Sequence, residues 1–328
     1  MFRDDPPPGF VRRHGRYFCR ARGGPIIRYR CTGCRRTFSY ATFRYSYRQK
    51  KPHVDAVLMR LLCSGVSLRA AARLLGINRK TVFAKLHRLA HHGQALHRVL
   101  LDRTSLAGHF QLDELETFES NRFQPVTVPL LIDKHTYFLL AWAAAPMRRK
   151  GRMTPGQKKM RDSHEALHGK RPTQSNAAVT RCLAVLKRHA RCPVVLETDR
   201  KPSYRRIAAR LLGARLVHLT RDSRTRRDRK NPLFPINHTN AMVRYCLARL
   251  KRRTWCITRR RGWLERALAV YASWFNYCRG ITNKTRTSPA QAVGIAHSRL
   301  TESDWLSWRQ AWHNAGRILP AGLAANTT

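Results

Sequence analysis

The sequence predicts an α/β fold with a mixed sheet flanked by helices, preceded by a small ribbon-like segment and a helix-turn-helix domain. From about residue 105 the apolar residues change from helical to strand-like spacing. Helix-like and strand-like segments then alternate to about residue 277. The first 50 residues are different, because they are rich in Arg, Tyr and Gly and contain a Cys-x-x-Cys pair.

The charge of the chain indicates a polyanionic partner. The 328 residues include 65 Lys and Arg against 18 Asp and Glu, a net charge of +47. The basic residues run along the whole chain, so nucleic acid is the first expectation and a ribosomal-type or membrane-surface protein the other. The sequence has no apolar run long enough for a membrane span and no signal-peptide core. Nine cysteines, an odd number, fit a reducing cytoplasm, where we expect association with the nucleoid.

Four regions are predicted. Residues 1–50 form a degenerate zinc-ribbon-like basic segment, 51–104 a helix-turn-helix domain, and 105–295 the α/β domain. Residues 296–328 form a C-terminal helix and a disordered tail. The helical spacing of Trp305, Trp308 and Trp312 predicts that one face of that helix packs into the core.

The N-terminal cysteines raise the question of zinc. Cys31 and Cys34 lie between short strand-like pieces, which is half of a zinc ribbon. Zinc needs four thiolate or imidazole ligands, and no second Cys-x-x-Cys lies upstream. Cys19 and His14 are the residues that could complete a Zn²⁺ site. The alternative is a degraded ribbon without metal.

A pair of short helices is predicted between residues 67 and 90. Ser67 can cap the first and Asn78 the second, and Gly76 provides the turn between them. A helix-turn-helix places its second helix in the major groove of DNA. The candidate DNA contacts at or near the leading end of that helix are Arg79, Lys80, Thr81 and Lys85. The alternative is an ordinary pair of helices in a helical domain.

The α/β domain is predicted to begin with strands. The run HFQLDELETFES reads as one strand, and two apolar runs around residues 133–136 predict a β-hairpin. The basic stretch 148–172 is expected to be a mobile loop over nucleic acid. A helix, a strand, a helix, a strand and a basic loop follow, as TQSNAAVTRCLAVLKRHA, CPVVLETD, SYRRIAARLLG, ARLVHLT and RDSRTRRDRKNP. Two further helices are expected at about 235–253 and 262–277.

Two acidic residues stand out. Asp113 lies inside the apolar run QLDELETF, and Asp199 ends the strand VVLETD. A buried carboxylate is costly unless a cation or hydrogen bonds compensate it. Two such acids on neighbouring strands would make an oxygen-only site that selects Mg²⁺ or Mn²⁺, as in two-metal phosphoryl transfer. The alternative is that each acid forms a salt bridge with an arginine.

Three segments carry a resemblance to a known family. QLDELETF, LETDRKPSY and INHTNAMVRYCLARLKRRTW, the last followed by LERALAVYASWFNY, resemble bacterial insertion-sequence transposases. These are DDE recombinases with an RNase H-like catalytic domain, and their zinc ribbon and helix-turn-helix occur in the same order. The resemblance covers about residues 10–295. It implies an RNase H-like fold for 105–295, with Asp113 and Asp199 as the first two catalytic acids.

The third acid of that family is missing. It is a glutamate three residues before a helix asparagine, which here is Asn240, so the matching residue is Asn237. Asn237, Asn240 and Arg244 share one face of the expected helix, and that face can point at a metal ion or a phosphate. The amide oxygen of Asn237 would be a weaker Mg²⁺ ligand than a carboxylate. His238, about 100° away on the helix, is a further catalytic candidate as a phosphate contact or proton carrier.

The neighbouring acids and the basic residues have other expected places. Glu114 and Glu197 are expected to point to the sheet face opposite Asp113 and Asp199. Phosphate contacts are expected from basic and amide side chains of the loops and helices: Arg148, Arg149, Lys150, Arg224, Arg226, Arg227, Asn240, Arg244, Arg249, Lys251, Arg252 and Arg253.

Two functions remain open at this point. The first is a transposase that cleaves and joins DNA at element ends and target, as a homo-oligomer on double-stranded DNA, with Mg²⁺ or Mn²⁺ held by Asp113, Asp199 and Asn237. The second is a catalytically impaired or decayed transposase that acts only as a sequence-specific DNA-binding protein. An RNase H-like nuclease of another kind is a weaker third interpretation, because a helix-turn-helix argues against a sequence-blind enzyme.

Overall fold

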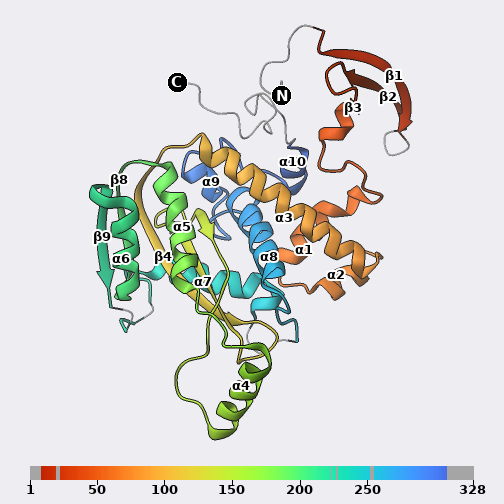
Figure 1. The fold of residues 1–328 in the computed structure, drawn as a ribbon. Helices are drawn as coiled ribbons and strands as arrows, with labels where there is room; N and C mark the ends of the chain where they lie inside the picture. The colour runs from red at the N-terminus through yellow and green to blue at the C-terminus, as the bar shows by residue number, and fades with distance from the viewer. Residues whose placement is uncertain (1–8, 20–22, 223, 227, 252–254, 309–328) are drawn as a thin grey trace.

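The structure is a computed structural model that describes residues 9–19, 23–222, 224–226, 228–251 and 255–308. Figure 1 shows a small N-terminal sheet standing apart from the body, a group of helices beneath it, and a larger sheet with helices on its faces. In the described part of the chain, no helix is both long and apolar enough to cross a membrane.

The N-terminal segment forms an antiparallel sheet of three strands in its described residues. The strands are β1 (Val11–Cys19), β2 (Gly24–Cys31) and β3 (Thr37–Ser39), in that order across the sheet. Most of its side chains are exposed or half-exposed, and Ile26 and Cys31 are among the few apolar ones that are buried. Short 3-10 turns at Tyr40–Phe43 and Pro52–Val54 lead from this sheet to the first α-helix.

The next region is helical, with α1 (Asp55–Cys63), α2 (Leu68–Leu74) and α3 (Arg79–Asp102). The two predicted caps are confirmed: Ser67 accepts a hydrogen bond from the backbone N–H of Ala70, and Asn78 accepts one from that of Lys80. Helix α3 runs past the expected end near residue 90 because its apolar face continues. It packs along α8 (Arg261–Ser273), and a side chain at Gly93 would clash with Ser273 there.

The main sheet is mixed, as predicted. Its strands in the described chain are β4 (Leu106–Phe118), β5 (Pro125–Asp133), β6 (Leu139–Trp142), β7 (Ala145–Pro146), β8 (Ala190–Asp199) and β9 (Leu216–Arg221). The order is β6-β5-β4-β8-β9, with β7 paired to β5. Strands β4, β5 and β6 are antiparallel, whereas β8 and β9 run parallel to β4. This arrangement is compatible with an RNase H-like core.

Helices cover both faces of this sheet (Figure 1). One face carries α5 (Ser175–His189) and α6 (Pro202–Leu212), which is followed by a 3-10 turn at Gly213–Arg215. The other face carries α7 (Phe234–Cys246), which packs on β4 and β5. Because side chains alternate along a strand, neighbouring residues of β4 reach different helices.

The predicted hairpin is confirmed. Strands β5 and β6 are antiparallel, and the turn between them is organised by Asp133. One Asp133 oxygen accepts hydrogen bonds from the backbone N–H groups of His135 and Thr136 and from the Thr136 hydroxyl, at 2.8–3.0 Å. This buried carboxylate therefore serves the turn.

The stretch expected to be a loop contains a helix, α4 (Pro155–His168). Thr154 caps it in a reciprocal capping box with Gln157, and Pro155 occupies the first turn, where its missing N–H does no harm. None of its residues is buried, and Figure 1 shows it projecting from the body. The prediction of a loop was wrong because Thr154, Pro155 and Gln157 together start a helix within the basic stretch.

Helix α7 is shorter than the expected 235–253. It ends at Cys246, whose carbonyl oxygen accepts a hydrogen bond from the N–H of Gly65 at 2.7 Å, and Leu247 is extended. A 3-10 turn at Ala248–Leu250 follows. The segment just after α1 thus caps the C-terminal end of α7.

The C-terminal part packs against the helices. A π-helical turn at Trp274–Cys278 extends α8, and α9 (Pro289–Ala292) and α10 (Glu302–Ser307) follow. Trp305 and Trp308 are buried, as the tryptophan spacing predicted, and His92 Nε2 donates a hydrogen bond to the Trp305 carbonyl oxygen at 3.0 Å. Trp312 and the expected disordered tail lie outside the described residues.

Candidate active site

Asp113 and Asp199 lie on adjacent parallel strands. The β4–β8 register pairs Gln111 with Glu197, an offset of 86 residues (197 − 111), and the same offset relates Asp113 to Asp199. Neighbouring strands are about 4.8 Å apart, and Asp113 and Asp199 each lie two residues beyond the last residues paired between β4 and β8. Asp113 is half-buried within β4, and Asp199 is half-buried at the end of β8.

The asparagine in contact with Asp113 is Asn240. Its amide nitrogen donates a hydrogen bond to an Asp113 carboxylate oxygen at 2.8 Å. The amide oxygen of Asn240 is buried and has no hydrogen-bond partner among the described residues. Sequence reasoning assigned the third position to Asn237, one helical turn earlier on the same face. The structure instead puts the Asn240 amide directly on the first acid.

The other acid is held by its own loop. One oxygen of Asp199 accepts the backbone N–H of Lys201 at 3.0 Å, at the point where β8 passes into α6. Tyr204 lies close to both aspartates. Burial, followed by the negative charges of Glu114, Asp113 and Asp199, raises the pKa of the Tyr204 phenol far above its usual range. The phenol therefore stays protonated and acts as a hydrogen-bond donor.

Glu114 points to the opposite face from Asp113, as predicted. Its oxygens accept hydrogen bonds from Thr127 at 2.8 Å, Ser175 at 2.5 Å and Tyr204 at 2.9 Å, and it is paired with Lys201. Burial alone would raise the pKa of Glu114, but the hydrogen bonds from Lys201 and Ser175 outweigh it, so the pKa is lowered. Glu114 is thus a fully engaged structural carboxylate.

Glu197 was expected on the far face, and this prediction was wrong. It lies two residues before Asp199, and strand alternation puts residues i and i+2 on the same face. Its side chain is fully buried and contacts Lys134 at 2.8 Å and Arg221 at 2.5 Å. Burial would raise the pKa of Glu197, but hydrogen bonds from Lys134, Arg221 and Gln111 lower it. A third carboxylate therefore shares the Asp113 face, with its oxygens occupied by these cations.

Gln111 links this cluster to α7, a role that sequence reasoning missed. Its amide nitrogen donates to Glu197 at 2.8 Å and to the Pro232 carbonyl at 2.6 Å. Its amide oxygen accepts the N–H of Ile236 at 3.0 Å. The available signal was a polar residue at a position that should be apolar. Gln111 fixes the first turn of α7 and thereby the placement of the asparagines.

His238 has a packing role in the structure. Its ring stacks on Phe234, with centroids 5.8 Å apart, and meets the Tyr137 ring edge-on at 5.7 Å. Burial, and then the charge of Arg279, lowers the pKa of His238, so the ring is neutral at pH 7. These contacts turn it towards the β5–β6 hairpin.

The donor set around Asp113 fits a hard divalent cation. It consists of two carboxylates on adjacent strands and a buried amide oxygen without a hydrogen bond, which are oxygen ligands of the kind Mg²⁺ and Mn²⁺ take. In the described part of the chain, no group of three or more His, Cys, Asp or Glu could hold a metal ion.

The proposed zinc ligands are not brought together. Cys19 pairs with Gly24 at one end of the β1–β2 hairpin, and Cys31 pairs with Val11 at the other end. Seven residues separate these ends, about 23 Å of strand. The N–H of Cys34 donates to the Cys31 sulfur at 3.4 Å, and this backbone contact lowers the pKa of the Cys31 thiol. His14 lies at the bulge between these ends, so the expected four-ligand Zn²⁺ site is not formed.

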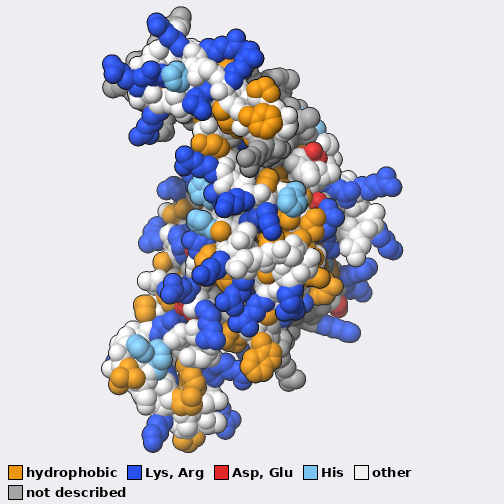
Figure 2. Space-filling model, turned by 90° about the vertical axis from the view of Figure 1, so that its right-hand side faces the viewer, with side chains coloured by type: hydrophobic (Ala, Val, Ile, Leu, Met, Phe, Trp, Pro, Cys, Tyr) orange, Lys and Arg blue, Asp and Glu red, His pale blue; other side chains and the backbone are white. Residues whose placement is uncertain are grey.

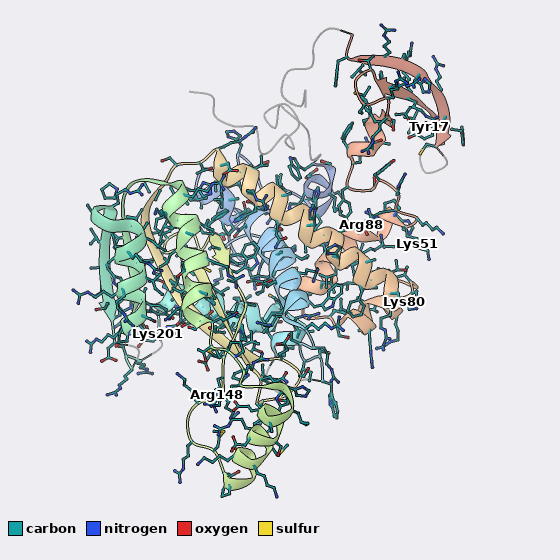
Figure 3. The ribbon with its side chains drawn as sticks, viewed as in Figure 1. Tyr17, Lys51, Lys80, Arg88, Arg148 and Lys201 are labelled. Carbon is teal, nitrogen blue, oxygen red and sulfur yellow. The ribbon has the colours of Figure 1, made fainter. Side chains whose placement is uncertain are left out.

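The predicted DNA contacts of α3 divide into two kinds. Lys80 is exposed near its leading end (Figure 3). Arg79 is also exposed, and Thr81 is half-buried. Lys85 is buried, and its ammonium group contacts Asp55 at 2.5 Å, Gln49 at 2.9 Å and the Lys51 carbonyl at 2.7 Å. The expectation that Lys85 faces DNA was therefore wrong. Its charge ties α3 to α1 and to the chain before it.

The basic residues after Asn240 also differ in their surroundings. Arg244 donates to the Glu116 carbonyl of β4 at 2.7 Å, so it fastens α7 to the sheet. Arg249 lies beyond the end of α7 and lines a cavity, and Arg252 lies outside the described residues. Over the face shown in Figure 2, Lys and Arg side chains are spread from the N-terminal sheet to α4, with few acidic ones between them.

Comparisons with known proteins give little similarity. No family model matches the chain, and no curated protein matches its sequence. Among solved structures, a chain of the simian T-cell lymphotropic virus intasome in complex with the PP2A regulatory subunit B56 gamma aligns over 73% of this chain and 74% of its own. The identity is 14% and the TM-score is 0.29, values too low to establish a shared fold.

Proposed function

We propose that this protein is a DNA strand transferase of the transposase type, which acts on the ends of a mobile element by phosphoryl transfer. One observation carries the proposal. Asp113 and Asp199 lie at the same level of adjacent parallel strands, and the Asn240 amide reaches Asp113 from α7. Two carboxylates and an amide on adjoining elements are oxygen donors of the kind that Mg²⁺ and Mn²⁺ take, which supports a cation-dependent reaction.

The side chains divide the work as follows. Asp113, Asp199 and an asparagine oxygen would hold Mg²⁺ or Mn²⁺, which supplies Lewis-acid activation of the phosphodiester and of the attacking oxygen. Asn240 orients the Asp113 carboxylate through its hydrogen bond. Gln111 holds the start of α7, whose Asn240 contacts Asp113 of the sheet. Asn237 remains a proposed ligand from one turn earlier on that face.

The DNA is proposed to bind through the α2–α3 pair and the basic surface. Arg79 and Lys80 stand exposed at the first turn of α3, which a helix-turn-helix presents to the major groove. Basic side chains elsewhere neutralise phosphates and position the duplex without reading its sequence. Action on two element ends and a target calls for a homo-oligomer on double-stranded DNA, within the nucleoid of the cytoplasm.

A second function has its own supporting observation. The third acid is absent, and Asn240 donates a hydrogen bond to Asp113 where a cation would otherwise neutralise it. A protein that has lost catalysis and only binds DNA would keep this hydrogen bond as a structural contact. The two functions therefore differ in whether metal enters the Asp113 site.

The deciding experiment is strand cleavage. Purified protein is incubated with Mn²⁺ or Mg²⁺ and an end-labelled duplex that spans the junction between the mobile element and its flank. We expect metal-dependent nicking at the junction, reduced at least about 10³-fold by Asp113→Asn and by Asp199→Asn. Asp162→Asn, which removes an exposed carboxylate on α4, is the matched control and should cleave normally.

Each outcome assigns one function. Nicking that needs both aspartates supports the transferase. Binding of the duplex without nicking, together with nicking gained by Asn237→Glu, supports the DNA-binding protein that has lost its third acid. Nicking that persists in Asp113→Asn contradicts the proposed site.

A further inference from the structure

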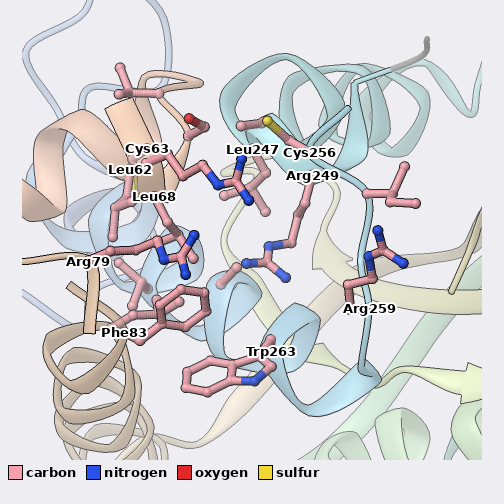
Figure 4. A pocket seen from close by; sticks show the side chains of 18 of the residues that line it. Leu62, Cys63, Leu68, Arg79, Phe83, Leu247, Arg249, Cys256, Arg259 and Trp263 are labelled. Atoms are coloured by element: carbon pink, nitrogen blue, oxygen red, sulfur yellow. The ribbon is translucent and has the colours of Figure 1, made fainter. Parts of the chain in front are cut away.

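A cavity separates the helix-turn-helix region from the α/β domain. Its volume is about 560 Å³, and α1, α2 and α3 form one wall. The other wall is α8 with the segment that follows α7 (Figure 4). This volume is typical of a small-molecule pocket and far too small for a duplex. It is large enough for one nucleotide.

The charges in this cavity are unbalanced. Arg79 and Arg249 point into the same space in Figure 4, and Arg259 also lines the cavity. No acidic side chain is among the described residues that line it. Burial lowers the pKa of Arg249 to about 10, so its guanidinium keeps its charge at pH 7 in a poorly hydrated place. A half-buried cation with no carboxylate among the described lining residues favours an anion, and a phosphate matches the guanidinium geometry.

The cavity also offers aromatic surfaces. Phe83 of α3 and Trp263 of α8 meet edge-on with centroids 5.0 Å apart, and both line the space. Trp255 lines it too and is fully exposed, which places a flat apolar ring at the solvent side. Aromatic rings stack on any nucleobase, whatever the sequence. Arginines that suit a phosphate, next to aromatic rings that suit a base, would favour a nucleotide over inorganic phosphate.

The position of the cavity connects the two proposed DNA-handling regions. Arg79 is the first residue of α3, the end proposed to meet the major groove. Arg249 follows the end of α7 at Cys246. Asn240, at the candidate active site, lies about 9 Å before that end along the helix axis. The cavity lining therefore includes residues that adjoin both proposed DNA-handling regions.

We propose that this cavity takes a single unstacked nucleotide of the bound DNA, with its base against Phe83 and Trp263 and its phosphate on Arg249 and Arg79. This inference rests on the proposed DNA binding. Extruding a base is least costly where it is unpaired, so DNA with an unpaired base should bind more tightly than the paired duplex. The bound nucleotide would fix the distance between the DNA-reading helix and the active site.

The test compares two fluorescein-labelled 30-base-pair duplexes that differ by one unpaired thymidine at the centre. Anisotropy titration of the full chain should show roughly tenfold tighter binding of the bulged duplex. Arg249→Gln should abolish this preference, whereas Arg210→Gln, an exposed arginine on α6, should keep it. Trp255→Ala should weaken the preference, and because this side chain is fully exposed the variant is expected to fold.

A second readout locates the base. With 5-iododeoxyuridine in place of the unpaired thymidine, irradiation should crosslink it to Phe83, Trp255 or Trp263, as mapped by mass spectrometry. Equal affinity for the two duplexes, or a preference that Arg249→Gln leaves intact, overturns the proposal while DNA binding stands. Failure to bind either duplex overturns the DNA-binding function itself. Arg249-dependent binding of free dTMP without a bulge preference would overturn the DNA-strand source and assign the cavity to a free nucleotide.

Discussion

Asp113 and Glu114 are neighbours in β4 and have opposite environments. Glu114 faces α5 and α6, where three hydroxyl groups and Lys201 take up its oxygens. Asp113 faces α7, where an amide nitrogen of Asn240 reaches it and the amide oxygen beside it has no hydrogen bond among the described residues. A carboxylate that completes the fold is saturated by protein donors. Asp113 is instead contacted by the Asn240 amide, so the two faces of β4 present different chemistry.

The largest expected effect is on stability and concerns Glu114, whose oxygens are all engaged by protein donors. Glu114→Gln leaves the Lys201 charge and several hydroxyl groups poorly paired, so the free energy of unfolding should fall by about 3 kcal/mol. Asp113→Asn should change it by less than about 1 kcal/mol, because two adjacent carboxylates repel each other. Urea denaturation followed by circular dichroism measures both. Equal destabilisation by the two variants would erase the contrast between the faces.

The same contrast predicts a pH dependence. Glu114 and Glu197 have pKa values below their ordinary 4.5 in the folded protein, because hydrogen bonds and cations outweigh burial. Their stabilisation is fully present above pH 4.5 and is lost as pH falls through the lowered pKa values. The free energy of unfolding should therefore decline below about pH 4.5 in the wild type. Glu197→Gln should show a shallower decline, and an unchanged slope would argue against the cluster around Glu197.

Restoring a third acid on α7 should strengthen cation binding at the proposed Asp113 site. Asn237→Glu adds a carboxylate one turn before Asn240 and, by helical spacing, on the same side of α7, so Mn²⁺ affinity should rise about tenfold. Isothermal titration calorimetry measures the change. The matched variant His238→Glu adds the same charge on a face that packs against Phe234 and Tyr137, and it should not raise the affinity. A gain with both variants would indicate a general charge effect.

The smallest expected effect is on DNA affinity and tests the exposed start of α3. Lys80→Ala removes an exposed charge at the start of α3, so DNA affinity should fall a few-fold and the salt slope by about 1. Lys187→Ala, an exposed lysine on α5, is the control and should leave the slope unchanged. Anisotropy titrations at several salt concentrations give both slopes. An equal loss with the two variants would remove α3 as the DNA-facing element.

Much of the fold followed from local patterns. Ser67 and Asn78 cap the helices they were predicted to cap, because capping depends on residues only two or three positions away. The hairpin at Asp133 followed for the same reason. Strand alternation could also have placed Glu197 correctly, since it requires only a count of two residues back from Asp199.

Other features depend on contacts between distant segments. The helical position of Lys85 predicts a DNA contact, but its ammonium group is engaged by Asp55 and Gln49. No pattern close to Lys85 in the sequence indicates these contacts. The choice between Asn237 and Asn240 depends on how α7 is rotated and shifted against β4, which Gln111 sets from 125 residues away. The cavity around Arg249 forms only where α2, α3 and α8 meet.

The central claim is that the Asp113 face holds a divalent cation, and Mn²⁺ binding tests it most directly. Electron paramagnetic resonance of free Mn²⁺ during titration into the wild-type protein should show saturable binding. Asp113→Asn and Asp199→Asn should each abolish that binding, whereas Asp162→Asn should retain it. Saturable binding that survives Asp113→Asn, or its absence from the wild type, would contradict the claim and leave Asp113 and Asn240 as a structural contact.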